Sequence, residues 1–236
     1  MLSKISETDP RLEAKQMEYT GETGKVKAYQ ARPKGPGKHP GVIVVQEIFG
    51  LNRHIEDVAR RVALEGYLVV APDALSPLGG SPSSDDEARA MMQKLDYQKT
   101  VKDFAAAVKY LQTNPQSTGK VGVTGFCWGG GVSNQVASNS NVDAAVPFYG
   151  MQPKPEDVPR IKASLLIHYA GEDERINAGI AAYEEALKSA GVDYKQYVYP
   201  GTRHGFFNDT RPIYNEEAAK LAWSRTIKFF DEKLKT

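Results

Sequence analysis

The chain has 236 residues, of which 41% are hydrophobic and 25% are charged, so it carries enough apolar side chains for one sizeable core. Its 30 basic and 29 acidic residues leave a net charge of +1, which gives no support for binding to nucleic acid. The single cysteine excludes an intrachain disulfide and a cysteine-rich metal site. No apolar run reaches the roughly 18 residues that span a bilayer, and the polar start does not resemble a secretory signal. We therefore expect a cytoplasmic protein that does not bind membranes.

Strands and helices alternate along the chain. Short β-branched or aromatic runs predict strands, and apolar residues at helical spacing predict helices. The predicted strands cover residues 25–31, 41–46, 67–71, 121–126, 144–148, 164–170 and 194–198. The predicted helices cover residues 55–65, 87–112, 180–189 and 215–234, with another after the glycines that follow residue 126, whereas 33–40 and 73–86 read as loops. This alternation predicts an α/β fold, with a mainly parallel central sheet and helices on both faces, in one domain over residues 1–236.

One cysteine lies in a glycine-rich turn between a predicted strand and a predicted helix. The segment GFCWGG at 125–130 has the spacing of the G-x-S-x-G nucleophile elbow, with Cys127 in place of serine. Small neighbours permit the sharp turn, and the N-terminus of the following helix favours the thiolate. The backbone N–H of Trp128 is then a candidate oxyanion donor. The alternatives are a small buried cysteine or a phosphate-binding loop, although the glycine spacings of the common phosphate loops are absent.

An acid and a histidine follow later strands, in the chain order that an α/β hydrolase requires. Asp173 follows the predicted strand 164–170, and His204 follows the predicted strand 194–198. We expect His204 to accept the thiol proton and Asp173 to fix the imidazole tautomer. Glu172 and Glu174 are alternative acids, because the run is acidic throughout.

Glu47 follows the strand at 41–46, in the loop where such folds supply the second oxyanion N–H. A carboxylate beside an oxyanion site opposes the reaction, so Glu47 must be protonated, paired or displaced when substrate arrives. The alternative is an ion pair with Arg53 or another cation. Of the remaining histidines, we interpret His168 as a core residue within a strand and His54 as a candidate for lining the pocket.

Together these segments resemble the dienelactone hydrolase family, the carboxymethylenebutenolidases. The matching segments are QEIFGLN at 46–52, EGYLVVAPD at 65–73, GFCWGGG at 125–131, GEDERI at 171–176 and RHGF at 203–206. The resemblance implies an α/β-hydrolase fold, a small ester or lactone substrate, no metal or organic cofactor, and a triad of Cys127, His204 and Asp173. It further implies that Glu47 takes the thiol proton when substrate binds. The oxyanion donors would be the N–H groups of Ile48 and Trp128.

The chain departs from the family where arginines hold a substrate carboxylate, because those places fall on Pro77 and Asn208. Arg89, Arg203 and Arg211 are the alternative candidates for that task. Aromatic residues near the motifs are candidates for the substrate pocket, with core packing as the alternative. They are Phe49, Trp128, Tyr149, Phe206 and Phe207. The same triad also suits a thioesterase, a small-ester esterase or an acyltransferase, and a non-catalytic binding protein of this fold is a further alternative.

Overall fold

The structure is a computed structural model that describes residues 2–236. It divides into two compact units. The N-terminal unit comprises Lys4–Gly122, and the C-terminal unit comprises Val123–Thr236 together with residues 2–3. Each helix in residues 2–236 is too short or too polar to span a membrane.

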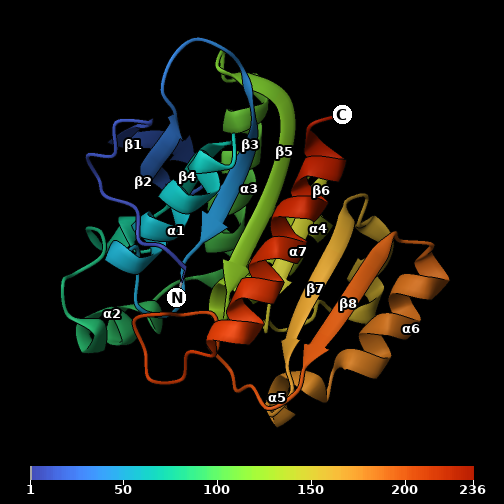
Figure 1. Cartoon of the computed structure of the whole chain (residues 1–236). Helices are drawn as coiled ribbons and strands as arrows, with labels where there is room; N and C mark the ends of the chain where they lie inside the picture. The colour runs from blue at the N-terminus through green and yellow to red at the C-terminus, as the bar shows by residue number, and fades with distance from the viewer. Residues whose placement is uncertain (1) are drawn as a thin grey trace. The chain divides into compact units, whose positions relative to one another are not determined.

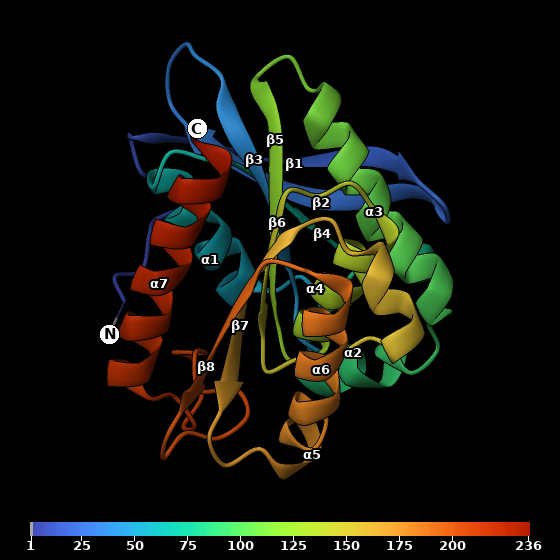
Figure 2. The same cartoon turned by 90° about the vertical axis from the view of Figure 1, so that its right-hand side faces the viewer.

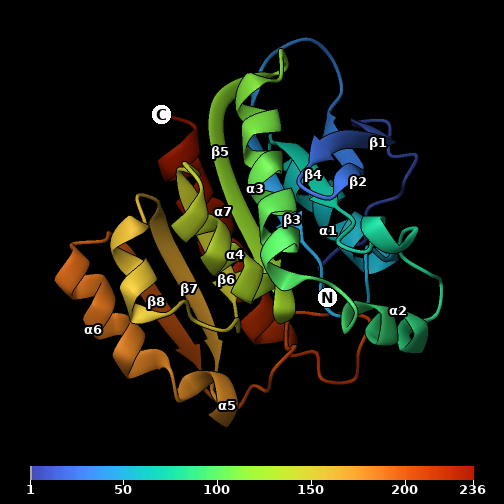
Figure 3. The same ribbon diagram turned by 180° about the vertical axis from the view of Figure 1, so that it is seen from behind.

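The N-terminal unit is a twisted set of four strands with helices on both faces. Its strands are β1 (Leu12–Gly21), β2 (Gly24–Pro33), β3 (His39–Val45) and β4 (Leu68–Pro72), in the spatial order β1-β2-β4-β3. Strands β3 and β4 pair in parallel, whereas β1 and β2 form an antiparallel hairpin. Helix α1 (Arg53–Leu64) lies on one face and α3 (Tyr97–Thr113) on the other, and α2 (Asp85–Met92) precedes α3 (Figures 2 and 3). Both faces of β3 and β4 are therefore buried, as parallel strands require.

The C-terminal unit continues the pattern with parallel strands. Strand β5 (Ser117–Phe126) enters this unit at Val123, and β6 (Ala144–Phe148), β7 (Ser164–Ala170) and β8 (Tyr194–Tyr199) follow in spatial order. Strands β6, β7 and β8 pair in parallel, and the arrows of β7 and β8 point the same way in Figure 1. Helices α4 (Trp128–Asn139) and α6 (Ile180–Ala190) cover one face of these strands, and α7 (Glu216–Leu234) covers the other (Figure 2). The carboxyl ends of the strands thus meet at one edge, where ligand sites lie in such sheets.

The predicted α/β class is confirmed, and the strands predicted at 144–148 and 164–170 have the observed bounds. Residues 87–112 are largely helical, as predicted, but they form two helices, because the Asp96 side chain caps α3 by accepting from Lys99 N at 3.1 Å. Strand β1 was not predicted, because only two of its ten residues, Leu12 and Tyr19, are buried and its apolar signal is weak. Two 3-10 turns (Ser76–Leu78 and Pro155–Arg160) and the short helix α5 (Glu174–Asn177) were also not predicted.

Candidate active site

Cys127 sits on a strained turn between β5 and α4. It has φ 59° and ψ −119°, a conformation that glycine adopts readily and other residues rarely do. Its N–H donates to Phe148 O at 3.1 Å, and its own carbonyl accepts from Gly130 N at 2.9 Å and Gly131 N at 3.2 Å. The sharp strand-to-helix turn predicted from the sequence is therefore confirmed. Trp128 is the first residue of α4, so its backbone N–H belongs to the helix N-terminus.

Two glycines make this turn sterically possible. A Cβ on Gly125 would lie 2.2 Å from Gly129 O, and a Cβ on Gly130 would lie 2.3 Å from Phe148 O. Both distances are far inside van der Waals contact, so neither position accepts a side chain without moving backbone. Cys127 itself remains partly exposed. The local sequence therefore places one thiol, on a rigid support, at the carboxyl end of β5.

Asp173 and His204 come together as a hydrogen-bonded pair. The distance from Asp173 Oδ2 to His204 Nδ1 is 2.5 Å, and the Asp173 side chain is buried. The other oxygen, Oδ1, accepts from Ile176 N at 3.4 Å, so the carboxylate also caps α5. Glu172 and Glu174, the alternative acids, are both exposed. The structure thus pairs His204 with Asp173.

The hydrogen bond with Asp173 determines which nitrogen of the His204 imidazole carries the proton. A carboxylate only accepts hydrogen bonds, so in the neutral ring Nδ1 carries the proton and Nε2 carries the lone pair. His204 Nε2 is buried, and no residue among 2–236 forms a hydrogen bond with it. A base with this geometry is ready to accept a proton from a nucleophile or from water.

Tyr149 connects the turn at Cys127 with His204. It follows Phe148, whose carbonyl holds the Cys127 N–H, and it too has a positive φ, 37°. Its N–H donates to His168 O at 2.7 Å, and its ring centroid lies 5.0 Å from that of His204. A second strained residue therefore lies at the carboxyl end of β6, against the imidazole.

The aromatic residues after His204 are fully buried. Phe206 packs against Tyr149 with ring centroids 5.3 Å apart, so it lies beside the residue that touches the imidazole. Phe207 stacks at 4.9 Å on Phe126, and its other aromatic neighbours are Phe148 and Trp223. These are the contacts of a core side chain for Phe207. A substrate-binding role for Tyr149, Phe206 and Phe207 stays a prediction.

The interpretation of His168 as a core residue is confirmed. Its side chain is fully buried in β7, and burial lowers the pKa of the imidazole to about 3. His168 Nδ1 lies 2.8 Å from the Tyr199 hydroxyl, and Nε2 lies 3.0 Å from Thr226 Oγ1. Because Thr226 donates its own hydroxyl proton to Ala222 O at 2.8 Å, it accepts from His168 Nε2, and Tyr199 donates to Nδ1. The ring is therefore neutral and fully hydrogen-bonded.

The loop after β3 carries the remaining predicted residues, within the N-terminal unit. Glu47 is buried, and its Oε1 lies 3.9 Å from His54 Nε2. Its carbonyl accepts from Gln46 Nε2 at 3.3 Å, whereas Ile48 and Phe49 are partly exposed. The roles of Glu47, Ile48 and Phe49 toward Cys127 stay predictions.

Buried Gln46 and partly exposed Ser81 tie this loop to the one after β4. Gln46 Oε1 accepts from Ala74 N at 3.0 Å. Ser81 Oγ accepts from Leu51 N at 2.8 Å and donates to Asp73 Oδ1 at 2.6 Å. These contacts of Gln46, Asp73 and Ser81 cannot be predicted from the sequence, because nothing in the spacing of the three residues indicates which loops they join.

Comparison with known proteins decides the family. The model of the Dienelactone hydrolase family matches residues 26–234, a span that includes both strained turns and the Asp173–His204 pair. The chain belongs to the dienelactone hydrolase family. A Synechocystis relative named "Putative carboxymethylenebutenolidase" is 35% identical over 229 residues, which cover 89% of this chain and 93% of that protein. A Saccharolobus solfataricus relative of the same name is 33% identical and covers 91% of this chain and 97% of its own length.

A solved structure agrees with the sequence relatives. The crystal structure of a "Putative Dienelactone Hydrolase" from Klebsiella pneumoniae superposes with a TM-score of 0.83 at 30% identity. It covers 94% of this chain and 99% of the Klebsiella chain. A fungal esterase from Rhizomucor miehei, at 14% identity, shares the fold with a TM-score of 0.75. The expected α/β-hydrolase fold and the membership in a hydrolase family are therefore both confirmed.

Proposed function

We propose that the chain hydrolyses a small ester or lactone with Cys127 as nucleophile, His204 as base and Asp173 as the orienting acid. The observation that carries the proposal is the hydrogen bond between Asp173 and His204, which leaves the lone pair of Nε2 for a proton. The strained turn at Cys127 supports the proposal, because residues with strained backbone conformations cluster at active sites. We further propose that residues 1–236 act as one catalytic domain.

The proposed reaction proceeds in two steps. The Cys127 thiol gives its proton to His204 Nε2, and the sulfur attacks the carbonyl carbon. The carbon–oxygen bond of the ester breaks, the leaving oxygen takes the proton from the imidazolium, and a thioester remains on Cys127. His204 then removes a proton from water, the hydroxide attacks the thioester, and the carbon–sulfur bond breaks. The Cys127 thiolate takes its proton back from the imidazolium, and the carboxylic acid product leaves; the proposed reaction uses no metal or organic cofactor.

Charge on the carbonyl oxygen needs hydrogen-bond donors in both steps. The proposed donors are the backbone N–H groups of Trp128 and Ile48, each such donor being worth about 3–4 kcal/mol of transition-state stabilisation. The family resemblance implies an alternative route for the first step, in which Glu47 instead of His204 receives the thiol proton when substrate arrives and the leaving oxygen takes that proton from Glu47. A Glu47→Gln variant should then bind substrate with little change in KM but react with Cys127 more slowly.

The proposed substrate is uncharged near the reacting carbonyl. Asn208 is buried, and its Oδ1 accepts from Thr210 N at 2.9 Å and from Thr210 Oγ1 at 2.6 Å. The Asn208 side chain therefore stabilises the loop after β8 and provides no positive charge for a substrate carboxylate. Pro77, at the other position, lies in a 3-10 turn and carries no charge. A matched pair of aryl esters, one neutral and one with a carboxylate, should show the higher kcat/KM for the neutral ester.

The test follows alkylation of the only cysteine from pH 5 to 9, alongside hydrolysis of a small aryl ester. We expect fast labelling at pH values below ~8.5, the pKa of a free thiol, and a parallel loss of activity. Slow labelling that leaves activity intact would contradict the proposal, as would a folded Cys127→Ala variant with full turnover. A panel of thioesters, lactones and acyl acceptors then separates the alternative activities of the same triad.

A further inference from the structure

Thr202 lies in the loop after β8 and bonds to two other backbone segments. Its side chain is buried, with 2% of the residue exposed. The hydroxyl donates to Tyr199 O at 2.7 Å and accepts from Gly171 N at 3.2 Å. The carbonyl of Thr202 accepts from Glu172 N at 2.8 Å. One residue therefore joins the loop after β7 to the loop after β8.

The joined segments are the ones that carry the acid and the histidine. Gly171 and Glu172 immediately precede Asp173, and Thr202 precedes His204 by two residues. The parallel pairing of β7 and β8 ends at Ala170 opposite Tyr199, so beyond it the strand ladder reaches these loops only through Gly171 N, which donates to Tyr199 O. Figure 1 shows the arrowheads of β7 and β8 ending side by side near α5. The hydrogen bonds of Thr202 extend the connection beyond the strand ends.

Close packing at Gly171 also indicates that the loops after β7 and β8 are joined. A Cβ on Gly171 would lie 2.7 Å from Tyr199 O and 3.0 Å from Pro200 Cα. The two loops therefore approach each other as closely as backbones allow. Gly171 N also donates to Tyr199 O at 2.9 Å, and the Thr202 hydroxyl shares both of these partners.

We infer that Thr202 is a positioning residue, which holds the two loops at the separation that the Asp173–His204 hydrogen bond requires. The inference rests on the proposed function for its effect on catalysis, but not for its effect on the hydrogen bond. Because the imidazole is oriented through Asp173, loss of the Thr202 hydroxyl disorders the base and leaves the substrate pocket in place. The expected consequence is a lower kcat with KM nearly unchanged.

The first experiment compares Thr202→Val, which removes the hydroxyl at constant shape, with Thr202→Ser, which retains it. We expect T202V to lower kcat by about tenfold to a hundredfold, as small misplacements of catalytic groups do, and T202S to restore most of the loss. Thr100→Val is the matched control, because Thr100 is a buried threonine whose hydroxyl donates to Asp96 O at 2.9 Å within α3. T100V should match the wild type in kcat. Equal losses in T202V and T202S, or no loss in T202V, would overturn the inference.

A double-mutant cycle shows whether Thr202 acts through Asp173. In an Asp173→Asn background the orienting carboxylate is already gone, so T202V should cause little further loss of kcat. Losses of kcat that multiply in the double variant would mean that Thr202 acts elsewhere, and would overturn the inference.

Proton NMR separates this inference from the proposed function. The His204 Nδ1–H in its short bond to Asp173 should give a downfield resonance, assigned by its loss in His204→Gln. We expect the resonance to shift upfield or broaden in T202V and to persist in T202S. An unchanged resonance in T202V overturns the inference even if the enzyme is active, and a changed one supports it even if Cys127→Ala retains activity. If T202V does not fold, Gly171→Ala, which forces the loops apart, should change the resonance in the same way, and an unchanged resonance there also overturns the inference.

Discussion

The N–H of Cys127 donates to the carbonyl oxygen of Phe148 at 3.1 Å, so the end of β6 fixes the position of the turn at Cys127. The same carbonyl is the nearest atom to the missing Cβ of Gly130, at 2.3 Å. Phe148 O therefore holds Cys127 in position, and it is also the atom against which α4 packs closely on β6. Tyr149, the next residue, touches the ring of His204. A shift of this one peptide would move Cys127 and His204 together.

This relationship predicts opposite effects for adjacent glycines of α4. Gly130→Ala should lower the free energy of unfolding by about 1–3 kcal/mol, because its Cβ must displace backbone, and should lower kcat as well. Gly131→Ala meets its nearest atom, Met151 N, at 3.4 Å, an ordinary contact, and should raise stability by up to about 1 kcal/mol through helix propensity. Urea unfolding and ester hydrolysis measure both effects. Two variants with the same change in stability would contradict the proposed origin in Phe148 O.

The backbone of Cys127 predicts a conflict between stability and activity. Cys127→Gly should be more stable than Cys127→Ala by about 1–2 kcal/mol, because glycine adopts φ 59° and ψ −119° without strain. Both variants should lack activity. Ala137→Gly, within α4, is the control and should lose about 1 kcal/mol, since its backbone is helical. If C127G were no more stable than C127A in urea unfolding, the turn would store no strain.

Burial of His168 predicts a loss of stability in acid. The folded protein holds its pKa at about 3, below the usual 6.5, so the unfolded chain binds the extra proton first. The stability due to neutral His168 is therefore fully present above pH 6.5 and is lost as the pH falls from 6.5 toward 3. His168→Gln keeps a donor for Thr226 and an acceptor for Tyr199 but does not titrate. Its free energy of unfolding should fall less steeply over this range than that of the wild type.

The control for this pH dependence is Leu166→Ala, also buried in β7, which should lower stability by a similar amount at every pH. Chemical unfolding at a series of pH values gives the slope for each variant. Parallel curves for H168Q and the wild type would show that protonation of His168 does not contribute to acid unfolding.

The sequence predicted the elements whose side chains are buried on both faces. Strands β6 and β7 are short runs of apolar residues, and their predicted bounds agree with the observed ones. Strand β1 is an edge strand with only two buried residues, so its stability comes from backbone pairing with β2, which leaves little trace in the sequence. The break between α2 and α3 depends on one cap, Asp96, inside a run that is otherwise helical in composition.

The positions of the candidate site residues followed from chain order, whereas their contacts required the structure. Asp173 was favoured on its place in the loop after β7, but an acidic run does not specify which carboxylate faces the histidine. The cap on α5 turns Asp173 inward and leaves Glu172 exposed. Thr202 gave no signal, because a buried threonine that joins two loops has no characteristic spacing. The sequence also does not show whether Phe206 and Phe207 line a pocket or pack in the core. Neighbouring aromatic residues in a loop have no periodic spacing that distinguishes the two.

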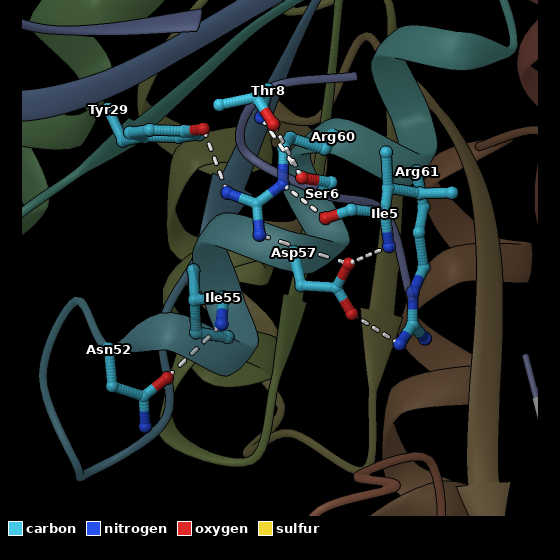
Figure 4. A network of polar contacts seen from close by, with 9 residues as sticks. All are labelled: Ile5, Ser6, Thr8, Tyr29, Asn52, Ile55, Asp57, Arg60 and Arg61. Atoms are coloured by element: carbon cyan, nitrogen blue, oxygen red, sulfur yellow. Dashed lines mark hydrogen bonds and ion pairs between the residues drawn. The ribbon is translucent and has the colours of Figure 1, made fainter. Parts of the chain in front are cut away.

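In the N-terminal unit, Asp57 anchors the segment before β1 to α1. Figure 4 shows its carboxylate between the two elements: Oδ1 accepts from Ile5 N at 2.7 Å, and Oδ2 accepts from Arg61 Nη2 at 2.5 Å. Arg60 adds a second link, because its Nε donates to Ile5 O at 2.8 Å and its Nη1 to the Tyr29 hydroxyl at 2.8 Å. Asp57, Arg60 and Arg61 are all buried, so these charged groups are removed from water and depend on one another.

Asp57→Ala should therefore lower the free energy of unfolding by roughly 3–5 kcal/mol, because it removes one partner of a buried ion pair. Hydrogen exchange at residues 4–11 should also become faster, since Ile5 N loses its acceptor. Lys220→Ala breaks the pair of Lys220 with Glu216, whose charged atoms lie 2.7 Å apart on the surface of α7, and should change stability by about 0–1 kcal/mol. Urea unfolding compares the two variants. Similar small losses in both would mean that the Asp57 cluster contributes no more than a surface ion pair, and unchanged exchange at Ile5 would mean that the segment before β1 is held by other contacts.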